Sequence, residues 1–131
     1  MQQLQIKQNR ALKTLYELDF LTPTKQMHKD LKLLMVKDIA KINTLKFVYN
    51  QRNEITPAVF KKYFIENRNI HTHNTRQTEN LHNLQTNSNR EKQLIKYRGA
   101  ILWNEIPLPE RKHKTIKTFS KHVRERLINS Y

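Results

Sequence analysis

The sequence predicts an all-α protein, with about five helices in a small irregular bundle and a long polar loop at about residues 66–93. The 131-residue chain contains one glycine and four prolines, so long stretches lack the residues that interrupt helices. Outside the loop, apolar side chains recur every three or four positions, which is the helical period. A chain of this length supports one modest core. We therefore expect one folding unit made of a helical part (1–65), the loop or linker (66–93) and a basic helical part (94–131).

Two helices are predicted before residue 35. The first covers about residues 2–18, and its apolar side chains lie mainly on one face: Leu4, Ala11, Leu12, Leu15, Tyr16 and Leu18. Pro23 interrupts this pattern. A short second helix follows, in which Met27, Leu31 and Leu34 have the i, i+4, i+7 spacing of one helix face. Thr24 is suited to cap its start.

The next segment carries the best candidate for a core helix. Asp38 is suited to accept the free amide hydrogens at the start of this helix. The apolar stripe that follows consists of Ile42, Leu45, Val48 and Tyr49. Thr56 and Pro57 then resemble a cap followed by proline at the first helical position, where no amide hydrogen is needed. This pattern predicts another helix, whose buried side is formed by Val59, Phe60, Tyr63 and Phe64.

Residues 66–93 interrupt the helical pattern. They include seven Asn, four Thr, three Gln and three His, and their apolar anchors are Ile70, Leu81 and Leu84. So few apolar groups do not offset the entropy lost when a backbone is ordered. A long loop that becomes ordered on a partner is therefore expected, with short strands around Leu81 and Leu84 as the alternative.

Helical periodicity returns at Leu94. A short helix or turn containing Ile95, Ala100, Ile101 and Trp103 is expected to end before Pro107, and Trp103 is assigned to the core. The last helix starts at about Thr115. Its apolar face contains Ile116, Phe119, Val123 and Leu127, and its other face contains Lys117, Lys121, Arg124 and Arg126.

The strongest signal in the composition is charge. The chain has 25 Lys and Arg against 11 Asp and Glu, which gives a net charge of +14. A field of this size attracts polyanions, so RNA or DNA is the expected partner, bound through its phosphate backbone. The alternative is a solvated basic surface that reflects codon bias, because 16 of the 25 basic residues are Lys. Basic residues are spread along the chain, so a site has to be located by clustering.

Two clusters are the candidate nucleic-acid contacts. The first is the basic face of the last helix, formed by Lys117, Lys121, Arg124 and Arg126. The alternative is that these cations are the ordinary wet face of an amphipathic helix. The second cluster consists of Arg76, Lys96, Tyr97 and Arg98, in which the Tyr97 ring either stacks on a base or belongs to the core.

Several other classes of protein are excluded or disfavoured. The longest apolar runs are four residues, so no membrane span and no secretory signal are expected, and an intracellular location in the nucleus or cytoplasm is favoured. The absence of Cys excludes thiolate zinc sites and cysteine nucleophiles. The pair His71 and His73 suits a shared metal poorly, because alternate residues of an extended chain point to opposite sides. We expect no metal and no cofactor.

An autonomous enzyme is also disfavoured. The 11 acidic residues are scattered and form no Asp-Asp or Asp-x-Asp motif. The sequence has no glycine-rich phosphate loop, and its serines lack the context of a nucleophile elbow. We therefore expect no catalytic residues and no small-molecule substrate.

The order of several short motifs resembles the C-terminal region of reverse transcriptases from jockey-like non-LTR retrotransposons. These motifs are Lys7-Gln8-Asn9-Arg10-Ala11-Leu12-Lys13, Thr22-Pro23, His73-Asn74-Thr75-Arg76, Tyr97-Arg98-Gly99-Ala100-Ile101-Leu102-Trp103-Asn104-Glu105-Ile106-Pro107 and Lys117-Thr118-Phe119-Ser120-Lys121. The resemblance extends over nearly the whole chain. The last motif departs from the family pattern, in which an adjacent Phe-Lys is commoner.

The resemblance implies a place after the polymerase core. In this family the palm supplies the metal-binding aspartates, usually within an aromatic-Ala-Asp-Asp motif, and this chain contains no such motif. The chain is then similar to the end of the thumb plus a helical extension, which holds template RNA or target DNA and performs no nucleotide transfer. The alternative is a structural piece that packs on a missing polymerase core without binding nucleic acid itself.

Overall fold

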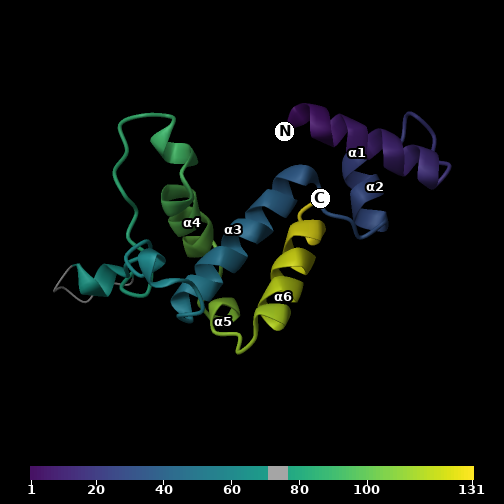
Figure 1. Ribbon diagram of the computed structural model, residues 1–131. Helices are drawn as coiled ribbons and strands as arrows, with labels where there is room; N and C mark the ends of the chain where they lie inside the picture. The colour runs from purple at the N-terminus through teal and green to yellow at the C-terminus, as the bar shows by residue number, and fades with distance from the viewer. Residues whose placement is uncertain (71–76) are drawn as a thin grey trace. The chain divides into compact units, whose positions relative to one another are not determined.

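The computed structural model describes residues 1–70 and 77–131 and confirms the all-α prediction (Figure 1). Within these residues there are six α-helices and no strand. They are α1 (Gln2–Leu15), α2 (Thr24–Asp30), α3 (Val36–Arg52), α4 (Ile95–Asn104), α5 (Leu108–Arg111) and α6 (Ile116–Asn129). Three short 3-10 turns are η1 (Ala58–Phe60), η2 (Asn67–Asn69) and η3 (Glu91–Gln93). None of the described helices combines the length and the apolar character needed to cross a membrane.

The chain forms two compact units. The first contains residues 1–42 and 120–131, and the second contains residues 43–119. The boundaries therefore fall inside α3 and α6, and the described part of the polar segment 66–93 belongs to the second unit. The predicted division at residues 65 and 93 does not coincide with these boundaries, and folding as one unit stays a prediction.

The core of the first unit is small and partly polar. Its buried polar side chains are those of His28 and Asp38. Its buried apolar side chains are Met27, Leu34, Met35, Ile42, Val123 and Ile128. Helix α1 forms as predicted but contributes no buried residue. It is held by polar contacts instead, since Gln8 Nε2 donates to the Leu34 carbonyl (3.0 Å) and Gln5 Oε1 accepts from the Val36 amide (2.8 Å).

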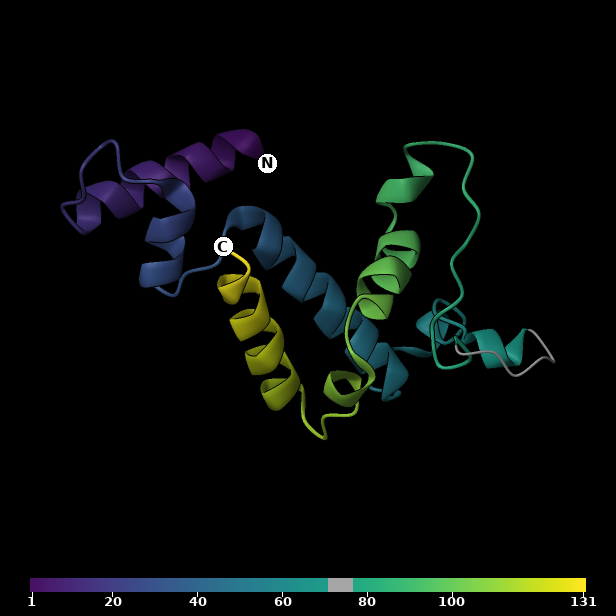
Figure 2. The same cartoon turned by 180° about the vertical axis from the view of Figure 1, so that it is seen from behind.

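The core of the second unit is built on the predicted stripe of α3. Leu45, Val48 and Tyr49 are all buried, and α4 lies beside this half of α3 (Figure 1, Figure 2). The Tyr49 and Phe119 rings stack with their centroids 4.9 Å apart. Trp103, whose ring lies 5.6 Å from that of Phe119, is 4% exposed and belongs to the core as predicted.

Gly99 allows α4 to approach α3 closely. A Cβ atom at this position would lie 2.8 Å from Cε1 and Cζ of Phe64 and 3.0 Å from Cγ2 of Val48. The Phe64 ring is itself fixed, because Phe47 packs against it with centroids 6.1 Å apart. The glycine of this chain is therefore used for helix packing.

The prediction of a helix after Pro57 is wrong. Only the turn η1 forms there, and Val59, which was assigned to the buried side, is 72% exposed. The Gln51 side chain explains the difference, because its Nε2 donates to the carbonyls of Phe60 (3.4 Å) and Lys61 (3.1 Å). Those carbonyls would accept from later amides in a continuing α-helix.

The described part of the polar segment is mainly irregular, as expected, and one of its anchors is Leu81. Leu81 is 1% exposed and forms an isolated antiparallel bridge with Glu66. The Asn104 side chain then binds the backbone of Leu81 on both sides, accepting from its amide and donating to its carbonyl (both 2.8 Å). The alternative of short strands around Leu81 and Leu84 thus reduces to one bridge in the described residues.

Three helices end in left-handed residues that are not glycine. Glu17, Lys32 and Glu54 have φ of 51°, 52° and 57° and follow α1, α2 and α3. The next residue in each case is apolar and donates its amide to a carbonyl five positions earlier, as Leu18 does to Lys13 (2.9 Å). This is the Schellman ending, in which glycine is usually preferred because it has no Cβ.

Replacing Glu54 by Gly should raise the free energy of unfolding by about 0.5–1 kcal/mol, because glycine adopts positive φ without steric cost. Chemical denaturation measures the change. Glu54→Ala is the matched control, since it removes the same charge but keeps Cβ. Equal stabilities of the two variants would contradict the strain at this position.

Gly99→Ala should lower the free energy of unfolding by about 1–3 kcal/mol, because the new methyl group overpacks the contact between α4, Phe64 and Val48. The helix propensity of alanine offsets about 1 kcal/mol of this loss. The same denaturation experiment tests it. A variant as stable as the original chain would show that the Phe64 ring yields freely.

Candidate nucleic-acid interface

The first unit contains a hollow where residues of α2 and α6 meet, which we call the basic groove. It has a volume of about 630 Å³, and its cationic side chains are Lys29, Lys32, Lys121 and Arg124. The other lining residues are Glu125, Ile128 and Asn129. Four cations therefore face one carboxylate around a hollow surface, which favours an anionic ligand.

The amphipathic pattern of α6 places two of these cations. Val123 and Ile128 are 1% and 8% exposed, so they bury one side of the helix. Lys121 and Arg124 are three positions apart and exposed, which puts them on neighbouring turns of the outer side. Arg124 also donates from Nη2 to the Lys32 carbonyl (3.0 Å) and so joins the two sides of the groove.

A buried histidine holds α2 in its place in the first unit. His28 is fully buried, with Nδ1 3.0 Å from the Leu33 carbonyl and Nε2 3.0 Å from Asn9 Oδ1. Gln5 Nε2 lies 3.2 Å from the same Nε2. Sequence reasoning missed this role, because a single histidine on a short helix carries no periodic signal.

The Tyr131 hydroxyl connects the chain after α6 to the start of α3. It accepts from the Met35 amide (2.9 Å) and donates to Asp38 Oδ2 (2.9 Å). Asp38 is 2% exposed and also pairs with Lys41 at 3.3 Å. The sequence predicted that Asp38 caps the start of this helix. Because α3 begins at Val36, Asp38 instead lies inside its first turn. Burial, with a further contribution from Asp38, raises the pKa of Tyr131 to about 12.

The predicted basic face of α6 is only partly gathered into the groove. Lys121 and Arg124 line it, whereas Lys117 and Arg126 are exposed on α6 but are not among its lining residues. Lys29 and Lys32 were missed by sequence reasoning. Their partnership with α6 depends on tertiary packing, and no spacing in the sequence reports it.

The second predicted cluster is less well suited to phosphate. Lys96, Tyr97 and Arg98 lie on α4 and are each half-buried. The Lys96 ammonium lies 5.9 Å from the centroid of the Tyr63 ring, so part of its charge is directed at an aromatic face. Arg76, together with His71 and His73, lies outside the described residues.

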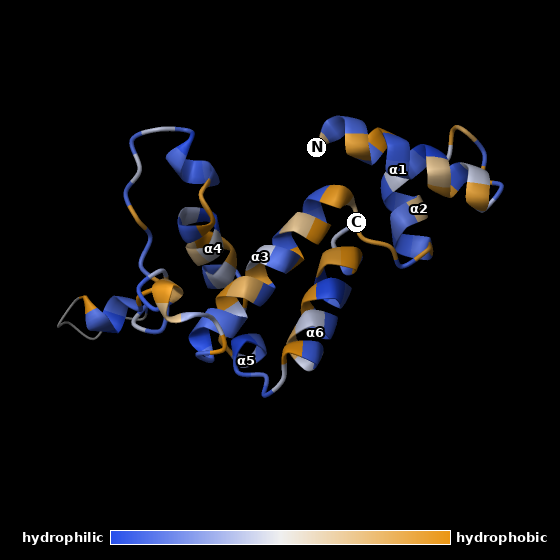
Figure 3. Ribbon diagram, viewed as in Figure 1, coloured by the Kyte–Doolittle hydropathy of each residue, from blue (hydrophilic) through white to orange (hydrophobic). Residues whose placement is uncertain are grey.

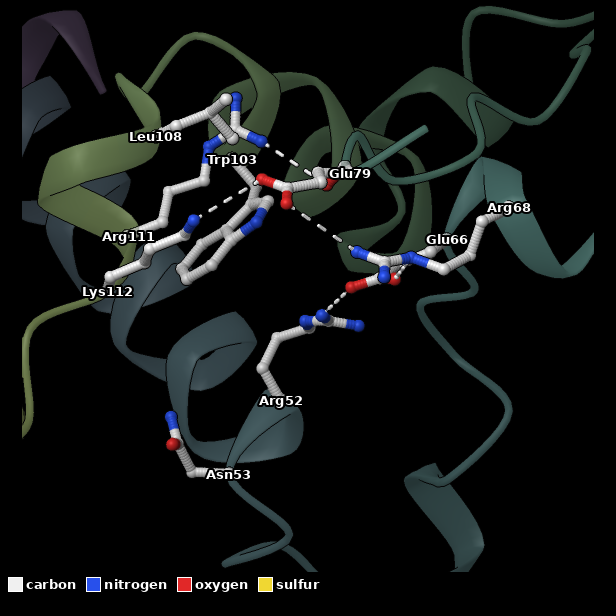
Figure 4. A pocket seen from close by; sticks show the side chains of 9 residues that line it. All are labelled: Arg52, Asn53, Glu66, Arg68, Glu79, Trp103, Leu108, Arg111 and Lys112. Carbon is white, nitrogen blue, oxygen red and sulfur yellow. Dashed lines mark hydrogen bonds and ion pairs between the residues drawn. The ribbon is translucent and has the colours of Figure 1, made fainter. Parts of the chain in front are cut away.

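The second unit contains another concentration of charge, which we call the ion-pair cluster (Figure 4). Its cations are Arg52, Arg68, Arg111 and Lys112, and its carboxylates are Glu66 and Glu79. They surround a cavity of about 210 Å³ beside Trp103. The members come from segments up to 60 residues apart, so sequence spacing gave no indication of the cluster.

Within residues 1–70 and 77–131, no group of three His, Asp or Glu side chains converges as metal ligands would. Comparisons with protein-family models, curated proteins and solved structures found no match to this chain. The geometry and charge of the chain itself are therefore the basis for assigning a function.

Tyr131→Phe should destabilise the protein by about 1–3 kcal/mol at neutral pH, because the Met35 amide and the buried Asp38 carboxylate each lose a partner. The pKa of Tyr131 is raised in the folded state, so its contribution is complete below the ordinary pKa of 10.0 and is lost as the pH rises toward about 12. Denaturation curves at several pH values measure the difference between the two proteins.

Tyr16→Phe is the control for this comparison, because Tyr16 is 48% exposed and belongs to the same unit. Its stability should follow that of the original chain at every pH. A difference between Tyr131→Phe and the original chain that persists unchanged at pH 12 would refute the raised pKa.

Proposed function

We propose that this chain is a non-catalytic nucleic-acid-binding module, which holds RNA template or target DNA through the phosphate backbone. We further propose that it corresponds to the C-terminal segment, after the polymerase core, of a non-LTR retrotransposon reverse transcriptase. The single observation that carries the binding proposal is the basic groove, in which Lys29, Lys32, Lys121 and Arg124 line one hollow. The motif order described above supports the origin.

The chemistry of the groove suits phosphates better than bases. Three of its four cations are lysines, whose ammonium groups are mobile point charges that bind phosphate without geometric selection. Arg124 already uses one of its donors on the Lys32 carbonyl, which leaves the rest of its guanidinium for a ligand. Contacts of this kind position a nucleic acid but carry little sequence information. Low sequence specificity is therefore expected.

The net charge of +14 adds a long-range attraction to the local contacts. Binding of this type depends steeply on salt, because each neutralised phosphate releases counterions. If about six phosphates of a duplex are neutralised in total, the logarithm of the affinity should fall against the logarithm of salt concentration with a slope near −5. The groove cations then account for part of this slope.

A second candidate function is a structural piece that packs on a missing polymerase core. The observation that favours it is the exposure of apolar side chains on α1 and the segment after it. Figure 3 colours the hydrophobic residues of the ribbon orange. Leu15 is 74% exposed, Phe20 82% and Leu21 84%. An isolated piece with such a surface should oligomerise, so a monodisperse monomer in light scattering would argue against this function.

The binding proposal is tested by fluorescence anisotropy of labelled 20-mers, as single-stranded RNA and as duplex DNA, across a salt series. Replacing Lys29 and Lys121 by Gln should weaken binding and reduce the magnitude of the salt slope on duplex DNA by about 2, because two phosphate contacts are lost. The ranking of the two ligands by the original chain identifies the preferred nucleic acid.

The matched control replaces Lys25 and Lys37 by Gln. Both lysines are exposed on helices of the same unit but do not line the groove, and the same charge is removed. The salt slope of the control should differ from that of the original chain by less than about half of the change measured for the groove variant. Equal losses in the two variants would mean that charge acts diffusely, and binding that is independent of salt would reject the proposal altogether.

A further inference from the structure

The ion-pair cluster of the second unit has more positive than negative charge around one cavity. Four cationic side chains and two carboxylates line the cavity of about 210 Å³, which leaves an excess of two positive charges (Figure 4). Glu66 is 8% exposed and is paired with both Arg52 and Arg68. Its carboxylate neutralises only one of these two arginines, so one excess positive charge lies with Arg52 and Arg68 and the other with Arg111, Lys112 and Glu79.

Glu79 pairs loosely with the cations on its two sides. Its Oε1 lies 4.0 Å from Arg68 Nη2, and its Oε2 lies 3.8 Å from Lys112 Nζ. Both distances exceed the 2.7–2.9 Å of a charge-assisted hydrogen bond. Figure 4 shows the Glu79 carboxylate between these two cations. An external anion at the same position would meet both of them.

The Arg111 guanidinium is fixed in place by neutral groups. Its Nε donates to the Ile106 carbonyl (2.6 Å), Nη2 to the Asn104 carbonyl (3.0 Å) and Nη1 to Asn80 Oδ1 (2.9 Å). These partners orient the guanidinium and satisfy its donors, but they do not neutralise its charge. Arg111 therefore supplies a fixed positive field to the cavity that it lines.

The positive charges of the arginines also repel one another. The pKa of Arg52 is lowered, first by burial and then by the positive charges of Arg68 and Arg111. The pKa of Arg111 is lowered by burial, and Glu79 offsets part of this effect. An anion in the cavity would relieve this repulsion, so the charge distribution points to the same ligand as the geometry does.

We propose that this cavity is a binding site for a phosphate group, held mainly by Arg68 and Lys112 within the field of Arg111. The ligand displaces the Glu79 carboxylate from its position between the two cations. The shared chemistry is a phosphate dianion, supplied either as a free small phosphate or as the terminal phosphomonoester of a nucleic-acid strand. The site belongs to the second unit and shares no residue with the basic groove, so it goes beyond the function proposed above.

The chain contains a local reporter for this site. Trp103 is the one tryptophan of the sequence, and it lines the cavity. Titrating the full chain with inorganic phosphate, while chloride keeps the ionic strength constant, should produce a saturable change in Trp103 fluorescence and in the NMR signal of its indole N–H. The constant ionic strength separates specific occupancy from general screening.

Three variants test the arrangement. Glu79→Gln removes the competing carboxylate and should tighten phosphate binding at least about threefold. The double variant Arg68→Gln and Lys112→Gln should abolish saturation. Its matched control, Lys61→Gln and Lys62→Gln, removes the same charge from exposed positions of the same unit outside the cavity and should leave the midpoint unchanged.

Two oligonucleotides distinguish the source of the phosphate. A 20-mer with a 5′-phosphate and the same 20-mer with a 5′-hydroxyl are titrated into the variant that lacks Lys29 and Lys121, so that the contribution of the groove is reduced and is the same for both oligonucleotides. A Trp103 response that requires the 5′-phosphate supports a strand end as the ligand, and a response to inorganic phosphate alone supports a small phosphate.

The proposal is overturned if no phosphate probe gives a saturable Trp103 response. It is also overturned if Glu79→Gln fails to tighten binding, or if the Lys61 and Lys62 control weakens binding as much as the cavity variant does. Since Glu79→Gln removes only a loose pair, it remains informative even where the double variant is unstable. Anisotropy of the groove variants is a separate measurement. A negative result for the cavity therefore does not test the proposed function, and a negative result for the groove does not test the cavity.

Discussion

A polar group that is buried must find its partner inside the protein, because its bonds to water are lost. Both units of this chain depend on that requirement. In the first, the buried side chains of His28 and Asp38 are surrounded by partners from α1, the α2–α3 connection and Tyr131. In the second, Nε2 of the buried Gln51 and the carboxylate of the buried Glu66 tie irregular backbone to α3. With modest apolar content, directional contacts fix positions that a larger core would fix by packing.

The fold class and the stronger helices could be predicted from the sequence, because their signals are local. The stripe Leu45, Val48 and Tyr49 is buried as its spacing indicates, and so are Phe119 and Val123 of α6. The segment after Pro57 could not be predicted in this way. Its cap and proline are typical of a helix start, but the Gln51 amide, from another part of the chain, takes the carbonyls that a helix needs. Local propensity is a weak prior when a tertiary contact competes for the same groups.

The candidate site was predictable to a similar degree. Lys121 and Arg124 could be found because they lie on the outer face of an amphipathic helix. Lys29 and Lys32 become part of the groove only through the packing of the folded unit. The ion-pair cluster has the same character, since Arg52, Glu66 and Glu79 share no sequence pattern. Charge composition predicts an anionic ligand, but only packing determines which of the many cations converge.

The left-handed residues at the ends of α1, α2 and α3 differ in whether they also line the groove. Glu17 and Glu54 sit at two of these ends and line neither the groove nor the cavity, so glycine at those positions relieves strain without removing a binding group. Lys32 is different, because its φ of 52° favours glycine while its ammonium lines the basic groove. At residue 32 the backbone conformation favours glycine, whereas the charge of the groove favours lysine. A search for more stable variants would therefore favour glycine at residue 32 and would remove one of the four cations of the groove.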